Sequence, residues 1–184
     1  MPDPIISVIT ATYNRSNILR YTIQSVLAST FSDWELLVVG DACTDDTENV
    51  VASFDDPRFR FSNLNENCGD QSGPNNAPLE MARGDYIAYL NHDDLYFPDH
   101  LIGSLDAIRS SGADLVFASA AAIRPVASGT WHPDEWEVLV TAPSSDSAYE
   151  PFVFSPASTW LLQRGIIDDI GPWCSWSETY WMPS

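Results

Sequence analysis

The chain has 184 residues, of which 45% are hydrophobic and 12% aromatic, so its composition is that of one globular domain and not of a disordered segment. Its 26 acidic residues against eight Lys and Arg give a formal net charge of −18, which disfavours binding to nucleic acid polymers and to anionic lipid headgroups. A negatively charged substrate therefore needs local help from a metal ion or from helix N-termini.

The cysteines and the N-terminus indicate the compartment. Cys43, Cys68 and Cys174 form neither a disulfide framework nor a zinc-binding spacing, which favours a reducing environment. The first residues, MPDPIISVITATYN, lack the basic segment and the long apolar run of a signal peptide. No later segment approaches the roughly 20 apolar residues of a spanning helix. We therefore expect a soluble, cytoplasmic protein without a transmembrane segment.

The first part of the chain alternates between buried strands and amphipathic helices. A β-branched strand over Ile5–Ala11 precedes a helix that Ser16 is expected to cap, and a second strand covers Glu35–Val39. Thr44 is placed to cap a second helix that has acidic residues in its first turn. A short third strand is predicted over Arg58–Ser62.

The alternation continues to residue 121. The further predicted elements are a polar loop over Asn63–Asn76, a short helix from Pro74 to about Arg83, a strand over Tyr86–Leu90, a helix from Pro98 to Ser110 that stops at Gly112, and a strand over Asp114–Ala121. Beyond this point the alternation stops, although Trp131–Ala142 and Phe152–Leu162 have strand character.

Strands that alternate with helices predict an α/β fold with a mainly parallel sheet, helices on both faces and an irregular C-terminal third. In such sheets ligands bind beyond the carboxyl ends of the strands. Three polar clusters follow predicted strands in this way, namely Thr10–Asn14, Gly40–Asp41 and Asn91–Asp94. We expect these clusters to lie along one rim of the sheet.

The adjacent carboxylates of Asp93 and Asp94 repel each other and need compensation. One of them can cap the following turn while the other faces solvent. Alternatively, they hold a divalent cation together with substrate phosphate oxygens, an arrangement that magnesium prefers. The two other polar clusters on the same rim favour the cation.

Other side chains on this rim are candidates for nucleotide contact. Asp41 either accepts hydrogen bonds from a nucleobase or ribose, or forms an Asx-turn ahead of the second helix. Tyr13 and Thr10 can contact a base, and Tyr13 is equally consistent with packing. His92 has no second histidine at a metal-ligand spacing, so we expect it beside the site and not on a metal.

These segments together resemble the inverting family 2 glycosyltransferases of GT-A fold. The resemblance spans almost the whole chain. It rests on four segments in order, SVITATYNR (Ser7–Arg15), SVLASTFSDWELLVVGDACTDDT (Ser25–Thr47), ARGDYIAYLNHDDL (Ala82–Leu95) and RGIIDDIGPW (Arg164–Trp173).

The resemblance implies a single GT-A domain over residues 1–184, with a nucleotide-sugar-binding half at 1–121 and an acceptor-side part at 122–184 that we expect to be truncated. It also implies transfer of a sugar, with inversion, from a nucleotide-diphosphate sugar to a hydroxyl of a glycan, lipid-linked or small-molecule acceptor. The implied cofactor is Mg²⁺ or Mn²⁺, which neutralises the diphosphate leaving group.

The family's binding residues map onto positions of this chain. The nucleotide-binding set is Thr10, Ala11, Tyr13, Asp41 and His92, in which Tyr13 stacks on the base and Asp41 contacts it. The family's Asp-x-Asp metal motif aligns with Asn91–His92–Asp93. Asp93 is then the metal carboxylate, and Asp94 or water compensates for the amide at Asn91.

Two departures from the family pattern concern polar contacts to the donor. Gly40 stands in place of the first of the two acids that usually follow the second strand. Asn75 and Asn76 stand where many members have Arg-Asn, which removes one potential contact to the diphosphate.

The catalytic base of the family is an Asp shortly after the segment that matches Gly171–Pro183. The sequence stops at Ser184, at or just before the position expected for this Asp, and Glu178 is the only acid nearby. Glu178 falls several residues early. Either Glu178 is the base, or the base lies beyond Ser184 and the chain is a truncated or non-catalytic domain that binds a nucleotide sugar.

Three tryptophans surround this candidate base, at Trp173, Trp176 and Trp181. They are consistent both with core packing and with a platform on which a sugar stacks. The sequence leaves these two interpretations open.

Two other functions fit the sequence less well. A sugar nucleotidyltransferase needs a Gly-rich, basic loop after the first strand, whereas this chain has ATYNRSN there. A phospho-acceptor receiver domain needs a Lys at a later strand end, and no basic residue falls at such a position after Asp93.

Overall fold

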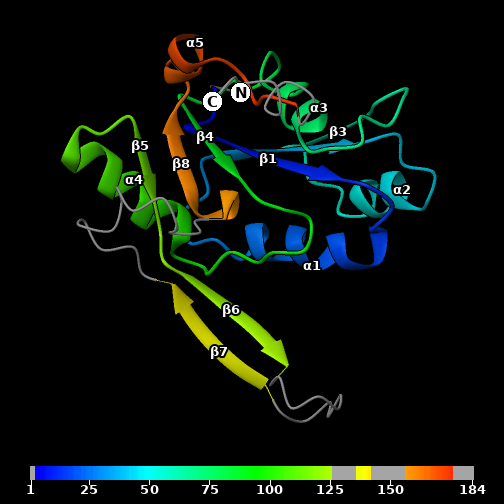
Figure 1. The fold of residues 1–184 in the computed structure, drawn as a ribbon, viewed down its shortest axis with the longest axis horizontal. Helices are drawn as coiled ribbons and strands as arrows, with labels where there is room; N and C mark the ends of the chain where they lie inside the picture. Colours follow the sequence, from blue (N-terminus) through cyan, green and yellow to red (C-terminus); the bar gives the residue numbers. More distant parts are fainter. Residues whose placement is uncertain (1–2, 126–135, 142–155, 176–184) are drawn as a thin grey trace, which may run out of the picture.

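The computed structural model describes residues 3–125, 136–141 and 156–175, which form a helix-covered six-stranded sheet and a separate two-stranded hairpin (Figure 1). The strand order in the larger sheet is β3-β2-β1-β4-β8-β5. Its strands are β1 (Ile6–Thr12), β2 (Trp34–Gly40), β3 (Phe59–Asn63), β4 (Tyr86–Tyr89), β5 (Leu115–Phe117) and β8 (Trp160–Gln163).

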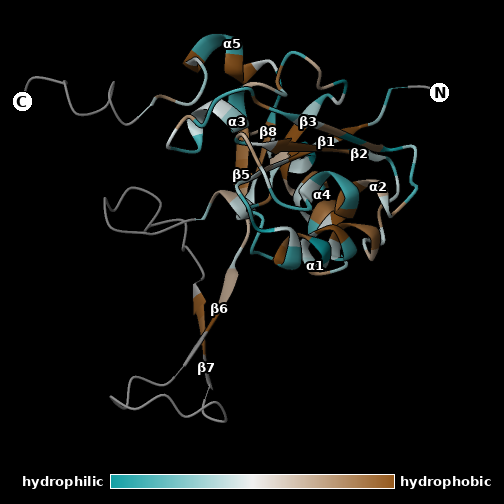
Figure 2. Ribbon diagram, turned by 90° about the vertical axis from the view of Figure 1, so that its right-hand side faces the viewer, coloured by the Kyte–Doolittle hydropathy of each residue, from teal (hydrophilic) through white to brown (hydrophobic). Residues whose placement is uncertain are grey.

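Helices cover both faces of this sheet, as the sequence predicts. They are α1 (Ser16–Leu27), α2 (Thr47–Ala52), α3 (Ser72–Asn76), α4 (His100–Ser111) and α5 (Ile166–Ile170), with a 3-10 turn at η2 (Ala157–Thr159). The helices α1, α2 and α4 lie on one face, and α3 and α5 lie on the other (Figure 2). No helix in the described part of the chain is both long enough and apolar enough to cross a membrane.

The sheet is mainly parallel, which confirms the predicted fold class. β1 pairs in parallel with β2 and β4, and β2 pairs in parallel with β3. β8 pairs antiparallel with β4 and β5, so it alone runs against the other five strands of this sheet. The register places Thr12 opposite Gly40 and Gly40 opposite Asn63, so the carboxyl ends of three strands meet at one edge.

The central strands supply two hydrophobic cores because successive side chains of a strand point to opposite faces. The core under α1, α2 and α4 contains Val8, Leu36, Val38, Ala88, Leu19, Ile23, Leu101 and Leu105. The core on the other face contains Ile9, Leu37, Ile87, Tyr89 and Leu162, with Trp160 and Trp173 packed against it. Both faces of β1, β2 and β4 are therefore buried, as their continuous apolar runs predict.

A buried carboxylate lies among these strands. Glu35 in β2 is 1% exposed and accepts hydrogen bonds from Ser7 Oγ (2.7 Å) and Arg83 N (2.8 Å), and from the guanidinium groups of Arg83 (2.9 Å) and Arg60 (2.7 Å). Gly84 N donates to the same Ser7 hydroxyl (2.9 Å), and a Cβ on Gly84 would lie 2.5 Å from Ser7 N. The network thus joins β1, β2, β3 and the turn that leads into β4.

The network also sets the ionisation of Glu35. Burial by itself raises the pKa of this carboxyl, but hydrogen bonds from Arg83 and Ser7 and the charge of Arg60 outweigh burial and lower the pKa below its usual range. The folded state therefore favours the charged form of Glu35.

The helix starts differ from the prediction by a few residues. α1 begins at Ser16 itself, and α2 begins at Thr47 and not directly after Thr44. Asp45 takes the role expected of Thr44, because its carboxylate accepts hydrogen bonds from Thr47 N (3.2 Å) and from Ser16 N (2.9 Å). One acid thus contacts the first residues of two helices, an arrangement that short-range capping patterns do not predict. The predicted stop of α4 at Gly112 is confirmed.

The predicted fifth strand, Asp114–Ala121, is split between two sheets. Its first half is β5, whereas its second half belongs to β6 (Ala120–Pro125), which pairs antiparallel with β7 (Trp136–Thr141). The chain leaves the larger sheet where Ala118 N donates to Thr159 O (2.9 Å). The resulting hairpin extends away from the body of the domain (Figure 1). β8 inserts between β4 and β5, so β5 does not pair directly with β4.

We expect Glu35→Gln to lower the free energy of unfolding by roughly 1.5–3 kcal/mol at pH 7, the usual size of hydrogen bonds to a charged group. Because the pKa of Glu35 is lowered on folding, its stabilisation is complete above the usual glutamate pKa and is lost as the pH falls through the lower, folded-state pKa. Urea unfolding from pH 7 down to pH 3 measures this. The deficit of the variant should shrink on acidification, and the exposed control Glu80→Gln should show none. A deficit that stays constant with pH would contradict the assignment.

Candidate functional site

A cavity of about 270 Å³ opens beyond the carboxyl ends of β1 and β2. It is lined by Ala11, Thr12, Tyr13, Asp41, Asn67, Gly69, Asp70, Gln71, Pro74 and His92. The three polar clusters predicted to share a rim therefore each contribute to it, and residues 64–76, the loop after β3 together with α3, supply the remaining wall. This is the edge where a parallel α/β sheet binds its ligands.

The loops after β1 and β2 are fastened to each other. Asn14 has a positive φ of 50°, and its Oδ1 accepts hydrogen bonds from Thr44 N (2.8 Å) and Asp45 N (3.2 Å). Slight burial by itself raises the pKa of the Asp45 carboxyl, but hydrogen bonds from Thr47 and Ser16 outweigh burial and lower this pKa. Between these fixed points Tyr13 is 49% exposed, so its ring is available at the cavity and not packed in the core.

Asp41 lies at the floor of the cavity and is 5% exposed. Its Oδ1 accepts a hydrogen bond from Cys68 N (2.8 Å), and its carbonyl accepts one from Asn67 Nδ2 (3.1 Å). Asp41 thus holds the loop over 64–76, and the described part of the chain gives it no Asx-turn bond. The Cys68 thiol also hydrogen-bonds to this side chain, and the carboxylate as a whole lines the cavity.

Neighbouring residues of β1 lie in different surroundings. Thr10 is fully buried and is not among the residues that line the cavity. Ala11 does line it, and its carbonyl oxygen is 3.2 Å from His92 Nδ1. Thr12, for which the sequence suggested no role, lines the cavity with a buried hydroxyl that has no partner among the described residues.

The two acids after β4 differ in their contacts. Asp93 is exposed and makes no hydrogen bond or ion pair with any residue that the structure describes. Asp94 Oδ2 accepts hydrogen bonds from Asn91 Nδ2 (3.0 Å) and from Ser158 Oγ (2.5 Å). Of these two acids, Asp93 is therefore the one whose carboxylate has no partner among the described residues.

The cavity carries negative charge. Asp41 and Asp70 are among its lining residues, and no Lys or Arg is among those that the structure describes there. Partial burial and the nearby carboxylates of Asp41 and Asp70 raise the pKa of the Cys68 thiol, as expected in a negative potential. An anionic ligand would therefore meet an unfavourable potential in this cavity.

The described residues contain no group of three or more His, Cys, Asp or Glu side chains that would enclose a metal ion. The donor set on the rim is one free carboxylate, that of Asp93. This set fits Mg²⁺ or Mn²⁺ bound jointly by a protein carboxylate, phosphate oxygens and water, which is how magnesium is usually held.

The loop over 64–76 supplies site residues that sequence reasoning missed. Asn67, Asp70 and Gln71 line the cavity. The sequence shows a long polar segment here, but the spacing of its residues does not indicate that a hydrogen bond to Asp41 would hold it over the strand ends. The loop's length was the only available signal, since long ordered loops are often functional.

Asn75 and Asn76, which stand where many family members have Arg-Asn, are both held inside the fold. Asn75 is 4% exposed, and Asn76 exchanges two hydrogen bonds with the backbone of Trp173 (2.9 Å each). Trp173 stacks with Trp160 and meets Tyr89 edge-on, which favours core packing over a sugar platform.

The segment predicted to carry the catalytic base lies outside the residues that the structure describes. It includes Trp176, Glu178, Trp181 and the last residue of the sequence, Ser184. The roles predicted for Glu178 and the two tryptophans therefore stay predictions, and so does the alternative of a base that lies beyond Ser184.

The packing around position 40 explains why a glycine stands there. A Cβ there would lie 2.4 Å from Asn63 Oδ1. Asn63 occupies this space while its Oδ1 accepts a hydrogen bond from Cys43 N (2.8 Å) and its Nδ2 donates to Cys43 O (2.9 Å). In this chain the position that the family gives to an acid is filled by an amide from β3.

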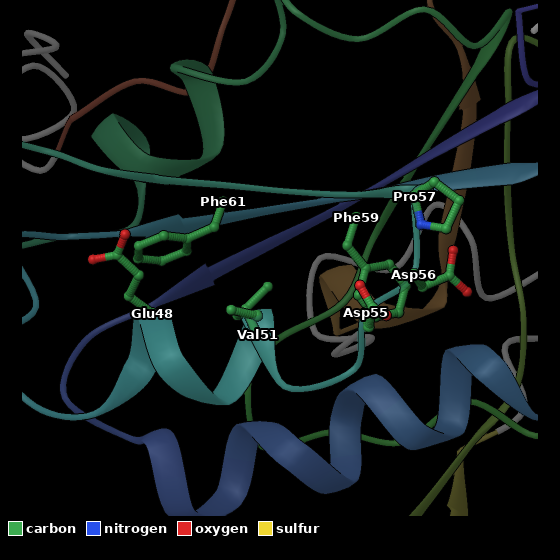
Figure 3. A pocket seen from close by; sticks show the side chains of 8 residues that line it. Glu48, Val51, Asp55, Asp56, Pro57, Phe59 and Phe61 are labelled. Carbon is green, nitrogen blue, oxygen red and sulfur yellow. The ribbon is translucent and has the colours of Figure 1, made fainter.

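A second hollow, of about 410 Å³, lies between α2 and β3 (Figure 3). Its acidic residues are Glu48, Asp55 and Asp56, and Asp56 is paired with Arg58 (2.7 Å). Val51, Phe59 and Phe61 give it an apolar floor that belongs to the core under α2. It shares no lining residue with the cavity at β1 and β2, so acidity alone does not define the site.

A model of the family described as Glycosyl transferase family 2 matches residues 7–171. The chain belongs to this family. It is 36% identical over 101 residues to the Escherichia coli enzyme named UDP-Glc:alpha-D-GlcNAc-diphosphoundecaprenol beta-1,3-glucosyltransferase WfgD, covering 55% of this chain and 40% of WfgD.

Two solved structures share the fold. Staphylococcus aureus TarS 1–349 in complex with UDP-GlcNAc superposes with a TM-score of 0.67 at 20% identity, over 90% of this chain and 47% of TarS. Mannosyltransferase PcManGT from Pyrobaculum calidifontis in complex with GDP-Man and Mn²⁺ superposes with a TM-score of 0.70 at 16% identity, over 94% and 48%. The predicted GT-A fold is thereby confirmed, and the chain spans less than half of each of these relatives.

We expect Gly40→Ala to lower the free energy of unfolding by about 1–3 kcal/mol, because its methyl group displaces Asn63 and leaves backbone groups of Cys43 unpaired. In the double variant with Asn63→Ala the severe clash is gone and the nearest remaining atom is Cys43 Sγ at 3.1 Å, so the two losses should not add. A thermal or urea double-mutant cycle measures this coupling. Strictly additive losses would show that Asn63 does not hold the space at Gly40.

Proposed function

We propose that this family 2 domain binds the nucleotide-sugar donor of a glycosyltransferase in the cavity beyond β1 and β2. The observation that carries the proposal is that an exposed aromatic ring (Tyr13) and the carboxylate of Asp41 line one cavity at the carboxyl ends of the strands. The free carboxylate of Asp93 lies on the same rim. We further propose that residues 1–121 bind the donor and that residues 122–184 belong to the part that binds the acceptor.

In the proposed site each group meets one part of a nucleoside diphosphate. Tyr13 stacks on the base, and the Asp41 carboxylate accepts a hydrogen bond from the base or ribose. The buried hydroxyl of Thr12 is unpartnered among the described residues and gains a partner on binding. Ala11 and His92 complete the wall and fix its shape, since His92 Nδ1 contacts the Ala11 carbonyl.

The negative charge of the cavity disfavours the diphosphate part of the donor. The carboxylates of Asp41 and Asp70 would repel the diphosphate, so we propose that Mg²⁺ or Mn²⁺ held by Asp93 strengthens donor binding. When bound, such an ion acts as a Lewis acid that stabilises the charge of the departing diphosphate. The Mn²⁺ in the PcManGT complex supports this assignment.

The proposed reaction is a single displacement with inversion at the anomeric carbon. A carboxylate base takes the proton of the acceptor hydroxyl, whose oxygen bonds to the anomeric carbon while the bond from that carbon to the diphosphate oxygen breaks. The nucleoside diphosphate leaves with the electron pair. Proton removal of this kind contributes roughly 10²–10⁴-fold in rate. Glu178 is the candidate base suggested by the sequence, and a carboxylate beyond Ser184 is the alternative.

The named relatives narrow the substrates to be tried first. WfgD is named for UDP-Glc and a diphosphoundecaprenol-linked acceptor, and TarS was solved with UDP-GlcNAc. We therefore propose a UDP-sugar as the donor and a lipid-linked glycan as the acceptor. GDP-Man in the PcManGT complex makes guanosine the alternative nucleoside to test.

Calorimetric titration with UDP, GDP and dTDP, each with and without Mn²⁺, tests the donor site. We expect one nucleotide to bind, and Mn²⁺ to tighten its binding. Asp41→Ala should weaken binding about tenfold even without metal, because one hydrogen bond to a charged group is lost. Asp93→Ala should remove the effect of Mn²⁺ and leave metal-free binding unchanged. The exposed helix variant Asp106→Ala serves as the control.

Two results would contradict the proposal. Wild-type chain that binds none of the three nucleotides would refute the donor site as a whole. If Asp41→Ala leaves nucleotide binding intact and circular dichroism shows that the fold is retained, then Asp41 holds residues 64–76 and does not contact the nucleotide.

A further inference from the structure

The turn between β4 and α4 is held by a closed set of side-chain hydrogen bonds. Asp94 Oδ2 accepts from Asn91 Nδ2 (3.0 Å) and from Ser158 Oγ (2.5 Å). The same Ser158 oxygen accepts from Asn91 N (3.0 Å). Asn91, Asp94 and Ser158 thus each contact the other two, and Ser158 comes from η2, 64 residues further along the chain.

The turn is also held from its other side. Thr22 of α1 is 1% exposed, and its hydroxyl lies 2.7 Å from the carbonyl oxygen of His92 and 3.0 Å from that of Asp94. Asp94 N donates back to Asn91 O (3.1 Å). The backbone from Asn91 to Asp94 is therefore fixed between α1 and η2, and the one side chain of this turn without a described partner is that of Asp93.

This arrangement explains the amide at Asn91, where the family motif has an acid. The Asn91 amide donates to Asp94 across 3.0 Å. A carboxylate at position 91 would instead place two negative charges at that separation, which is costly. An amide at this position supplies a donor that orients the Asp94 side chain.

We infer that Asp94 is a positioning residue, anchored by Ser158 and Asn91, which aims Asp93 at the divalent cation and is not itself a metal ligand. The inference rests on the proposed function. It replaces the sequence-based prediction that Asp94 completes the metal site. Because Ser158 lies in η2, it also couples the segment after residue 155 to the donor site. Outer partners of metal ligands typically affect metal affinity 10–100-fold.

The test compares an isosteric and a truncating substitution of Asp94. Asn at this position keeps an oxygen that accepts from Ser158 and Asn91 but loses the charge. The readout is the Mn²⁺ enhancement, defined as the ratio of the nucleotide Kd without Mn²⁺ to the Kd with it. We expect Asp94→Asn to keep the enhancement within about threefold of wild type, and Asp94→Ala and Ser158→Ala to reduce it about tenfold. Ser110→Ala, a matched substitution on the exposed side of α4, should change nothing.

Amide hydrogen exchange without metal or nucleotide gives a second, independent readout. Loss of the anchor should speed exchange at Asn91 and Asp94 in the Ser158→Ala and Asp94→Ala variants, and Asp94→Asn should leave it near the wild-type rate. A structural role elsewhere in the domain would not produce this selective pattern.

The outcomes separate the inference from the proposed function. Loss of the Mn²⁺ enhancement in Asp94→Asn, as complete as in Asp93→Asn, would make Asp94 a direct ligand and overturn the inference alone. An unchanged enhancement and unchanged exchange in Ser158→Ala would remove Ser158 as the anchor. Wild-type protein without any Mn²⁺ enhancement would refute the proposed metal site, and with it the inference.

Discussion

The buried carboxylate of Glu35 is the interaction on which the arrangement of the strands depends. It lies in β2 and collects donors from β1, from β3 and from the turn before β4. An ion this deeply buried is stabilising only if its hydrogen bonds are complete, and here four donor groups surround it. Because β4 enters the sheet from the Arg83–Gly84 turn, the network sets where β4 lies beside β1, and hence where the turn at Asn91–Asp94 emerges on the opposite edge.

At that opposite edge the fold separates side chains that hold loops from those left for a ligand. Asn14 and Asp45 fasten the first two loops to each other, Asp41 Oδ1 holds the loop over 64–76, and Ser158 holds the turn after β4. Once these bonds are made, Tyr13, the Asp41 carboxylate and Asp93 are what the described rim offers. Fixed loops with a few free groups are the expected form of a site that must be preorganised. The acidic hollow at α2 and β3 has charge as well, but it lies beside α2 and not beyond the carboxyl ends of β1 and β2.

Much of the fold and of the rim could be predicted from the sequence, because both depend on local patterns of apolar and polar residues. Continuous apolar runs such as ELLVV predict strands buried on both faces, and polar residues directly after them predict the rim. The residues that were missed depend on long-range contacts. Nothing near Asp41 in sequence indicates that it would bind Cys68 N, nothing near Asp94 points to Ser158, and the split of β5 from β6 follows from β8 inserting beside β4. For the same reason the two adjacent acids look equivalent in sequence and differ in the structure.

The central claim is that a nucleoside diphosphate and a divalent cation meet at the rim formed by β1, β2 and β4. Paramagnetic broadening of backbone amide resonances by Mn²⁺ tests it most directly, because the effect falls steeply with distance from the ion. The account predicts that substoichiometric Mn²⁺ with UDP broadens resonances of Asn91–Asp94 and of the neighbouring Tyr13, and that broadening is weak when UDP is omitted. Broadening centred on Glu48, Asp55 and Asp56 at the other acidic hollow, with or without UDP, would contradict it.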